Sequence, residues 1–364
     1  MKVIFLGTRG FPNVQGGVEK HCENLAVNLV QSGCQVTVFT RRPYVNKEIK
    51  EYKGVRLIDL PAVRQKSLEA LLHTFLGIIK CLGHKPDIVH IHGIGPGLFI
   101  PLAKLLGFKV VLTTHGSNYM HQKWNKAEKC FLKVCESISM RFADQIIAVS
   151  DPITKEVKER YGRDAYYIPN GVQLLEYESS GGVLDKYNLE KGKYILAVGR
   201  IVPEKGFHVL IEAFQELKAT GWKLVIAGGA DHESKYSIEL FDNIKKDERI
   251  IYTGFLSGKP LYEIYDNAGI YVLPSSYEGM PISLMEAMSF GLYCIASDIA
   301  ANRSLGLPEE NYFKVGDSGD LAAKLNQVIG GNFNLRLTRE QIDSLLCDYD
   351  WGIIAQKTLE VYNA

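Results

Sequence analysis

Two glutamates, Glu278 and Glu286, are separated by seven residues in the stretch SYEGMPISLMEAMSFG, residues 276–291. The stretch is typical of a loop that becomes a helix, because Pro281 suits a first helical turn, where its missing N–H is not needed. Gly279 permits an unusual backbone conformation and the close approach of a ligand. One carboxylate would therefore precede the helix, and the other would lie inside it.

The expected helix has one apolar side. At 100° per residue, Leu284, Met285 and Met288 share that side, and Glu286 points roughly the other way. A carboxylate turned away from the core can accept two hydrogen bonds from a ribose diol. The alternative is an ordinary exposed helix glutamate.

The start of this helix would present free backbone N–H groups from Met280 to Ser283, that of Ile282 included, at the carboxyl end of a strand. Such groups and the helix dipole favour a phosphate. Glu278 would then lie one step nearer to the phosphates or the sugar of a nucleotide. The alternative for Glu278 is a loop carboxylate close to a helix start.

Two cations lie in a second loop, in the stretch VGRIVPEKGFHVLIEAF (198–214). Arg200 is expected at the end of a strand and Lys205 near the start of the next helix. A lysine facing the positive end of a helix dipole costs a few tenths of a kcal/mol to about 1 kcal/mol. An anion bound between the two cations would offset that cost. The alternative is a pair of cations that face solvent.

A glycine-rich loop, GTRGFPNVQGGVEK (7–20), stands between the first strand and the first helix. Gly16 and Gly17 at the helix start would let backbone N–H groups approach a phosphate. The alternative is a tight turn that needs glycine for its geometry alone. The match to G-x-G-x-x-G is poor, and the second strand ends in TRRP without an acid for a ribose, which argues against a dinucleotide oxidoreductase.

Two histidines, His90 and His92, alternate on one strand and face the same way. They could ligate a metal, but no carboxylate or cysteine cluster accompanies them, so we expect them to line the core or a cleft. We therefore expect no metal and no cofactor.

The elements that position these residues alternate between short apolar runs and helical patterns. The expected strands are 2–7, 35–40, 55–60, 87–92, 109–115 and 145–150, then 193–199, 223–229, 249–254, 269–275 and 292–297. Helical patterns lie at 18–33, 67–82, 97–106, 123–142, 152–161 and from about 206. This rhythm predicts an α/β fold of two tandem, Rossmann-like, doubly wound domains. The polar, glycine-rich segment 168–192 suits a linker, and the default site is an interdomain cleft.

Charge divides the chain in two. Residues 1–170 carry 24 Lys/Arg and 14 Asp/Glu, and residues 171–364 carry 18 and 27. The basic first half is expected to meet something anionic. Within it, the basic-flanked stretch 63–85 has Arg64, Lys66, Lys80 and Lys85 positioned for an anionic membrane surface. The alternative is a crossover helix packed on the sheet.

The cysteines and the hydropathy indicate a compartment. Seven scattered cysteines without C-x-x-C, no secretory pattern and no apolar run of about 18 residues predict reduced thiols in a cytoplasmic protein.

The motifs together resemble one family. EGMPISLMEA resembles the E-x7-E motif of retaining glycosyltransferases of the GT-B class, family four. GRIVPEKG is similar to its Arg/Lys diphosphate motif, GGVEK to its glycine loop, and IPNGV (168–172) to its interdomain junction. The similarity covers essentially the whole chain in order, and GTRGFPNVQGG is most similar to transferases of bacterial surface-polysaccharide assembly. The C-terminal residues 350–364 resemble the family's last helix, which returns to the first domain.

The resemblance implies domains 1–170, with 350–364 added, for the acceptor side, and 171–349 for the nucleotide sugar. It also assigns roles. Gly17 would contact the donor phosphates, Arg200 and Lys205 would neutralise the diphosphate, Glu286 would hold the ribose hydroxyls and Glu278 would lie against the donor sugar. Phe255 would flank the nucleobase, and His115 would lie beside the transferred sugar. Family members often have other residues after this histidine, and Met280 commonly varies; neither difference removes a functional group.

The resemblance therefore implies a metal-independent hexosyltransferase that uses a UDP, GDP or dTDP sugar. It would act on a glycan or polyprenyl-diphosphate-linked acceptor, without nucleic acid, in the cytoplasm or at the inner face of the plasma membrane. Two alternatives stay open: a nucleotide-sugar epimerase of the same fold, and an inactive sugar-nucleotide-binding assembly subunit. The donor base, the sugar, the acceptor and the linkage also stay open.

Overall fold

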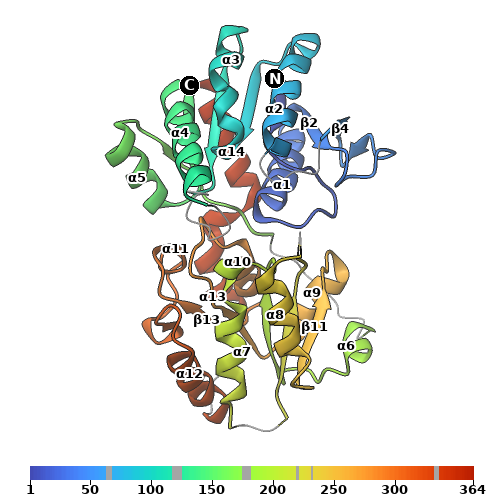
Figure 1. Cartoon of the computed structure of the whole chain (residues 1–364), viewed down its shortest axis with the longest axis vertical. Helices are drawn as coiled ribbons and strands as arrows, with labels where there is room; N and C mark the ends of the chain where they lie inside the picture. Colours follow the sequence, from blue (N-terminus) through green and yellow to red (C-terminus); the bar gives the residue numbers. More distant parts are fainter. Residues whose placement is uncertain (63–67, 117–124, 174–181, 219–220, 231–232, 332–335) are drawn as a thin grey trace. The chain divides into compact units, whose positions relative to one another are not determined.

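The chain forms two compact units. The computed structural model describes residues 1–62, 68–116, 125–173, 182–218, 221–230, 233–331 and 336–364. Unit 1 comprises Met1–Gly171 and Tyr349–Ala364, and unit 2 comprises Val172–Asp348. The sequence-based boundaries, 170 and 349, lie within one residue of these. Figure 1 shows the elements of both units.

Unit 1 is built on an eight-stranded sheet in the order β3-β4-β2-β1-β5-β6-β7-β8. All neighbouring strands are parallel except β3 and β4, which are antiparallel. The central strands β5 and β6 are buried along their whole length, as expected for a parallel sheet covered on both faces. The strands are β1 (Lys2–Leu6), β2 (Gln35–Arg41), β3 (Glu51–Tyr52), β4 (Val55–Leu60), β5 (Ile88–His92), β6 (Val110–Thr114), β7 (Gln145–Ala148) and β8 (Tyr166–Tyr167).

The helices of unit 1 include one from the far end of the chain. They are α1 (Gly17–Gln31), α2 (Leu68–His84), η1 (Pro96–Phe99), α3 (Ile100–Leu105), α4 (Lys126–Phe142), α5 (Asp151–Tyr161) and α14 (Trp351–Asn363). Helix α14 packs on α1. Trp351 is buried against Gly171, where an added Cβ would lie 2.5 Å from the indole ring. The C-terminal helix therefore completes the core of unit 1.

Unit 2 contains a six-stranded, all-parallel sheet in the order β11-β10-β9-β12-β13-β14. Its strands are β9 (Tyr194–Val198), β10 (Lys223–Ala227), β11 (Ile250–Gly254), β12 (Ile270–Leu273), β13 (Tyr293–Ser297) and β14 (Tyr312–Phe313). Its helices are α6 (Gly182–Tyr187), η3 (Pro203–Lys205), α7 (Phe207–Gln215), α8 (Lys235–Ile244), α9 (Lys259–Asn267), α10 (Ile282–Ser289), α11 (Ala300–Arg303), η4 (Glu309–Asn311), α12 (Ser318–Gly330), α13 (Arg339–Leu346) and η5 (Cys347–Tyr349).

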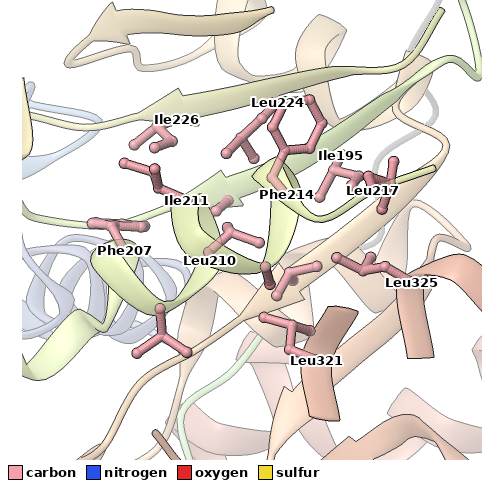
Figure 2. Close-up of a cluster of buried hydrophobic side chains, with 14 of the residues drawn as sticks. Ile195, Phe207, Leu210, Ile211, Phe214, Leu217, Leu224, Ile226, Leu321 and Leu325 are labelled. Atoms are coloured by element: carbon pink, nitrogen blue, oxygen red, sulfur yellow. The ribbon is translucent and has the colours of Figure 1, made fainter. Parts of the chain in front are cut away.

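Helix α7 anchors the core of unit 2. Its residues Phe207, Leu210, Ile211 and Phe214 recur at helical spacing and are buried. Figure 2 shows them beside side chains of β9, β10 and α12. Each fully buried side chain of this kind contributes about 1.5–3 kcal/mol. The loop before α7, which carries Lys205, is therefore attached to a well-packed helix.

The alternation read from the sequence is confirmed as an α/β fold with two parallel-sheet domains. The strands that the pattern missed, β3, β8 and β14, have two residues each and lie at sheet edges, so they contain no apolar run. The linker 168–192 holds helix α6, which its composition did not indicate, and its residues 174–181 lie outside the described residues.

The predicted start of helix α10 was also wrong by one position. Pro281 is not in the first helical turn but is the N-cap residue, with an extended backbone (φ −82°, ψ 94°). All seven cysteines are free thiols, and five of them are buried. Among the helices of the described ranges, none is both long and apolar enough to cross a bilayer.

Candidate active site

The candidate residues of unit 2 gather where its strand order reverses. Strand β9 lies between β10 and β12, so the chain winds outward in both directions from the β9–β12 pair. In doubly wound sheets, ligands bind outside the carboxyl ends of the strands at such a point. Arg200 follows the end of β9, and Glu278 follows the end of β12. The sequence placed each residue after its strand, but the strand order is what makes the two loops neighbours.

Lys205 and Glu278 form an ion pair. Lys205 Nζ lies 2.5 Å from Glu278 Oε1, and the two side chains are 17% and 10% exposed. Ser275 Oγ donates a second hydrogen bond, of 2.6 Å, to the same carboxylate oxygen. From the sequence, we expected the lysine to neutralise the diphosphate and the glutamate to lie against the donor sugar. In the structure the carboxylate itself offsets the unfavourable position of the lysine near the start of α7.

The backbone fixes this pair from both sides. Gly206, which links η3 to α7, has φ 68° and lies so close to β12 that an added Cβ would be 2.1 Å from the Pro274 carbonyl oxygen. A second main-chain contact joins the same two loops: the Ser276 N–H donates a 2.8 Å hydrogen bond to the Glu204 carbonyl oxygen. The Lys205 loop and the Glu278 loop are therefore held together by main-chain contacts.

Glu286 lies on α10 as the helical spacing predicts. Leu284, Met285 and Met288 are buried, and Glu286 is partly exposed. The hydroxyl of Tyr265 lies 3.3 Å from Glu286 Oε2 and 3.2 Å from the Ser283 carbonyl oxygen. Burial, with the neighbouring Tyr271 and Glu286, raises the pKa of Tyr265 well above its usual value, so it stays a neutral donor. One oxygen of Glu286 is thus oriented by a phenol.

The other expected nucleotide contacts surround α10 and β11. Phe255, directly after β11, is 43% exposed, which leaves its ring available for stacking. Met280 and Ile282 are 7% and 8% exposed and Pro281 is buried, so their side chains are not available to a ligand. Gly279 is partly exposed in the loop before α10, and no side chain caps this helix.

The glycine loop of unit 1 gives its two glycines different roles. Gly16 is the N-cap of α1 with φ 147°, and an added Cβ would lie 2.0 Å from Glu19 Oε2. It is therefore required by local geometry, beside the ion pair in which Arg9 Nε lies 3.1 Å from Glu19 Oε1. Gly17 begins α1 and has nothing within 4 Å of an added Cβ. Only Gly17 leaves open space for an approaching ligand.

Three histidines meet at the carboxyl ends of the central strands of unit 1. His92 ends β5, His115 directly follows β6, and His21 lies on α1. His115 Nε2 lies 3.5 Å from His92 Nδ1, and the His21 ring centroid is 4.8 Å from that of His115. Asn170 Oδ1 lies 2.8 Å from His21 Nδ1. Sequence reasoning missed His21, although its place one turn after Gly17 was a signal.

Burial keeps these imidazoles neutral. It lowers the pKa of His21 to about 4, opposed by the hydrogen bond that His21 donates to Asn170. The pKa values of His92 and His115 lie well below the usual value because of burial and of the neighbouring histidines. His90 serves a different purpose: its nitrogens lie 2.6 Å from the Tyr362 hydroxyl and 2.7 Å from Thr113 Oγ1, within the core.

The predicted site residues therefore fall into two groups. Arg200, Lys205, Phe255, Gly279, Met280, Pro281, Ile282, Glu278 and Glu286 belong to unit 2, and Gly16, Gly17 and His115 belong to unit 1. The structure joins Lys205 to Glu278 directly, and it adds Ser275 and Tyr265 as partners that the sequence did not reveal. Their signal was weak, since a serine and a tyrosine are common in any loop or helix.

Two family models match the chain in sequence. The model described as "Glycosyltransferase Family 4" matches residues 15–174, and "Glycosyl transferases group 1" matches residues 184–342. The first match lies in unit 1 except for residues 172–174, and the second lies in unit 2.

Curated relatives match over most of the chain. An uncharacterized glycosyltransferase of Methanocaldococcus jannaschii is 26% identical, over 100% of this chain and 98% of its own. The UDP-Gal:alpha-D-GlcNAc-diphosphoundecaprenol alpha-1,3-galactosyltransferase of Escherichia coli is 29% identical, over 76% of this chain and 74% of its own.

A solved structure shares the fold. HepE of Anabaena in complex with UDP superposes with a TM-score of 0.76 and 19% identity, covering 99% of each chain. At this identity the likeness concerns the fold alone.

Proposed function

The chain belongs to the GT-B glycosyltransferases of family four, and from this premise we propose that it is a retaining hexosyltransferase of bacterial surface-polysaccharide synthesis. The donor is a UDP, GDP or dTDP sugar, and the acceptor is a hydroxyl of a glycan or of a polyprenyl-diphosphate-linked sugar. The E. coli relative, which is named for a UDP-Gal donor and a diphosphoundecaprenol acceptor, supports this choice. The observation that carries it is the Lys205–Glu278 pair at the β9–β12 switch point.

In this proposal the diphosphate leaves as a charged group. Lys205 and Arg200 stabilise the charge that develops on it, together with backbone amides at the start of α10, an effect worth several kcal/mol. These protein cations replace Mg²⁺, so no metal is required for transfer. Glu278 and Ser275 fix the lysine ammonium in place before the donor arrives, which reduces the reorganisation needed during the reaction.

The remaining residues position the donor. Glu286, oriented by Tyr265, accepts hydrogen bonds from the ribose hydroxyls, and Phe255 flanks the base. Gly17 presents its backbone to the phosphates, and His115 lies beside the transferred sugar. The acceptor hydroxyl attacks from the face that the diphosphate leaves, which gives retention. Because Glu278 is bonded to Lys205, we assign it to positioning and not to covalent attack on the sugar.

The first prediction concerns the donor. We expect one of UDP, GDP and dTDP, at 100 times its Kd, to raise the free energy of unfolding by about 2.7 kcal/mol, because a ligand that binds only the folded state stabilises it. Thermal unfolding with each nucleotide measures this. If none of the three raises the melting temperature, the donor assignment is wrong. With the donor sugar but no acceptor, conversion to a new sugar nucleotide would instead indicate the epimerase.

A surface of α2 supports the proposed contact with a membrane. His73, Thr74, Ile78 and Cys81 are fully buried, and an added Cβ at Gly77 would lie 2.3 Å from Leu6 Cδ2 of β1. That face packs on the sheet. The opposite face exposes Leu72, Phe75, Ile79 and Leu82, which we call the α2 stripe. One side of α2 therefore packs on the sheet, as the crossover-helix alternative expected, and the other side is apolar and exposed.

Basic residues accompany the stripe. Lys80 and Lys85 are exposed on and after α2, while Arg64 and Lys66 lie outside the described residues. An apolar helix face flanked by lysines suits the surface of an anionic bilayer. We propose that unit 1 docks there, close to a lipid-linked acceptor.

The second prediction tests this docking. Phe75→Ser/Ile79→Ser is expected to reduce sedimentation with phosphatidylglycerol vesicles, because it removes apolar area from the stripe. Ile238→Ser, at an exposed apolar residue of α8, is the matched control and should sediment like the unaltered protein. Equal pelleting with phosphatidylcholine and with phosphatidylglycerol vesicles would argue against charge-driven docking.

A further inference from the structure

The histidine cluster of unit 1 has a geometry that the proposed sugar transfer does not require. One ring nitrogen from each of His21, His92 and His115 can be chosen so that all three lie within 4.8 Å of one another. We propose that these three imidazoles form a binding site for a transition-metal ion of the Zn²⁺ class. The sequence led us to expect no metal, because it suggested only His90 and His92 as a pair.

The distances between the three histidine nitrogens are slightly longer than those of a zinc site. In a tetrahedral site with Zn–N bonds of 2.0–2.1 Å, the ligand nitrogens are about 3.3–3.4 Å apart. The 3.5 Å between His115 Nε2 and His92 Nδ1 is already close to this value. The other separations are at most 4.8 Å, so they must shrink by no more than roughly 1.4 Å, which modest rotation of the imidazole rings can supply.

The hydrogen bond between His21 and Asn170 selects the ligand atom of His21. Asn170 Oδ1 accepts from Nδ1–H, which leaves the lone pair on Nε2. Within the described part of the chain, His21 Nε2 has no hydrogen-bond partner, and the residue is 2% exposed. Burying an unsatisfied polar nitrogen is unfavourable. A bound metal would satisfy it, and metal-binding histidines commonly donate their other N–H to an oxygen in this way.

The chemistry of the ligand set favours zinc or a similar ion. Neutral imidazole suits Zn²⁺, Cu²⁺, Fe²⁺ and Ni²⁺, and does not suit Mg²⁺ or Ca²⁺. His90 is not a fourth ligand, because Tyr362 and Thr113 engage both of its nitrogens. Three protein ligands leave one position for water or another small ligand. His115 is partly exposed, so this is the side from which an ion would enter.

Occupancy would have a consequence for catalysis. Since His115 is proposed to lie beside the transferred sugar, a zinc ion that takes its lone pair would inhibit transfer. This consequence rests on the proposed function, whereas metal binding itself does not.

The third prediction is measured with Co²⁺ as a spectroscopic substitute for Zn²⁺. We expect 1:1 binding with the visible absorption of a tetrahedral ion, displaced by Zn²⁺. His21→Ala should abolish this spectrum, and Asn170→Ala should weaken binding about 10- to 100-fold, because it removes the partner that orients His21. His208→Ala, at an exposed histidine of α7 in unit 2, is the matched control and should bind like the unaltered protein.

A measurement on the unaltered protein does not depend on any variant folding. In ¹⁵N NMR of the side chains, Zn²⁺ should shift the ring nitrogens of three of the nine histidines. The proposal is overturned if no saturable Co²⁺ spectrum appears, if folded His21→Ala keeps it, or if the shifted histidines are others. Zinc inhibition of transfer is then assayed separately, so that an inactive transferase and a missing metal site give different results.

Discussion

Replacing Lys205 by alanine is expected to lower kcat/KM for sugar transfer about 100- to 1000-fold, the usual effect of removing one preorganised electrostatic donor. The reason is that its ammonium, held 2.5 Å from Glu278 at the switch point of unit 2, would neutralise the departing diphosphate. Initial rates with the donor found by thermal unfolding measure the change. Lys235→Ala, in an exposed pair with Glu239 on α8, is the matched control and should keep full activity.

This variant also affects stability, which the sequence alone did not indicate. The sequence predicts that alanine at position 205 or 278 causes little loss of fold. In the structure, the Glu278 carboxylate is 10% exposed and accepts from Lys205 and Ser275. Loss of Lys205 removes the charged donor and leaves the Ser275 hydroxyl on this oxygen. We expect a loss of about 1–3 kcal/mol, less than for a fully buried pair. Lys205→Ala/Glu278→Ala should recover part of it, as a denaturant titration will measure.

If Lys205→Ala transfers sugar at a near-normal rate, the assignment of this site is wrong. If the loss of stability in the double variant equals or exceeds the sum of the losses in the two single variants, the two side chains do not form the coupled pair described above. The two measurements are independent, so either result stands without the other.

Replacing Gly206 by alanine is expected to destabilise unit 2 by about 2–5 kcal/mol and to reduce transfer as strongly as Lys205→Ala. A residue with a Cβ at φ 68° costs about 1–2 kcal/mol, and overpacking adds about 1–3 kcal/mol. The overpacking arises because the new Cβ would lie 2.1 Å from the Pro274 carbonyl oxygen, which cannot rotate away. The main chain must move there, and Lys205 is the adjacent residue.

A control glycine with a similar φ but open surroundings separates the backbone cost from the overpacking cost. Gly192, also in unit 2, has φ 75° and nothing within 4 Å of an added Cβ. Gly192→Ala should therefore show only the backbone cost and keep full activity. Thermal unfolding and transfer rates for both variants measure the difference. Equal losses in the two would mean that the contact with Pro274 does not position Lys205.

Much of the fold could be predicted because it follows from local pattern. Buried strands such as β1, with residues 3–6, are continuous apolar runs, and helices such as α1 and α4 have apolar residues at helical spacing, so the alternation of elements was evident. The two-residue strands at the sheet edges were not evident from the sequence. They are defined by their hydrogen bonds to a neighbouring strand, and they are too short to form an apolar run. Helix α6 was also missed, because this six-residue helix has no buried residue and therefore no apolar face to recognise.

The sequence by itself determined which residue types stand at the ends of the strands: glycines after β1, Arg200 after β9, Glu278 after β12 and His115 after β6. Only the tertiary structure decided their partners. Strand order brings Lys205 to Glu278 across 73 positions, and it brings Asn170 to His21 across 149. Hydrogen bonds and ion pairs depend on distances of about 3 Å, and such distances between residues far apart in the chain are set by how the sheet is ordered and packed, which no local pattern of residues contains.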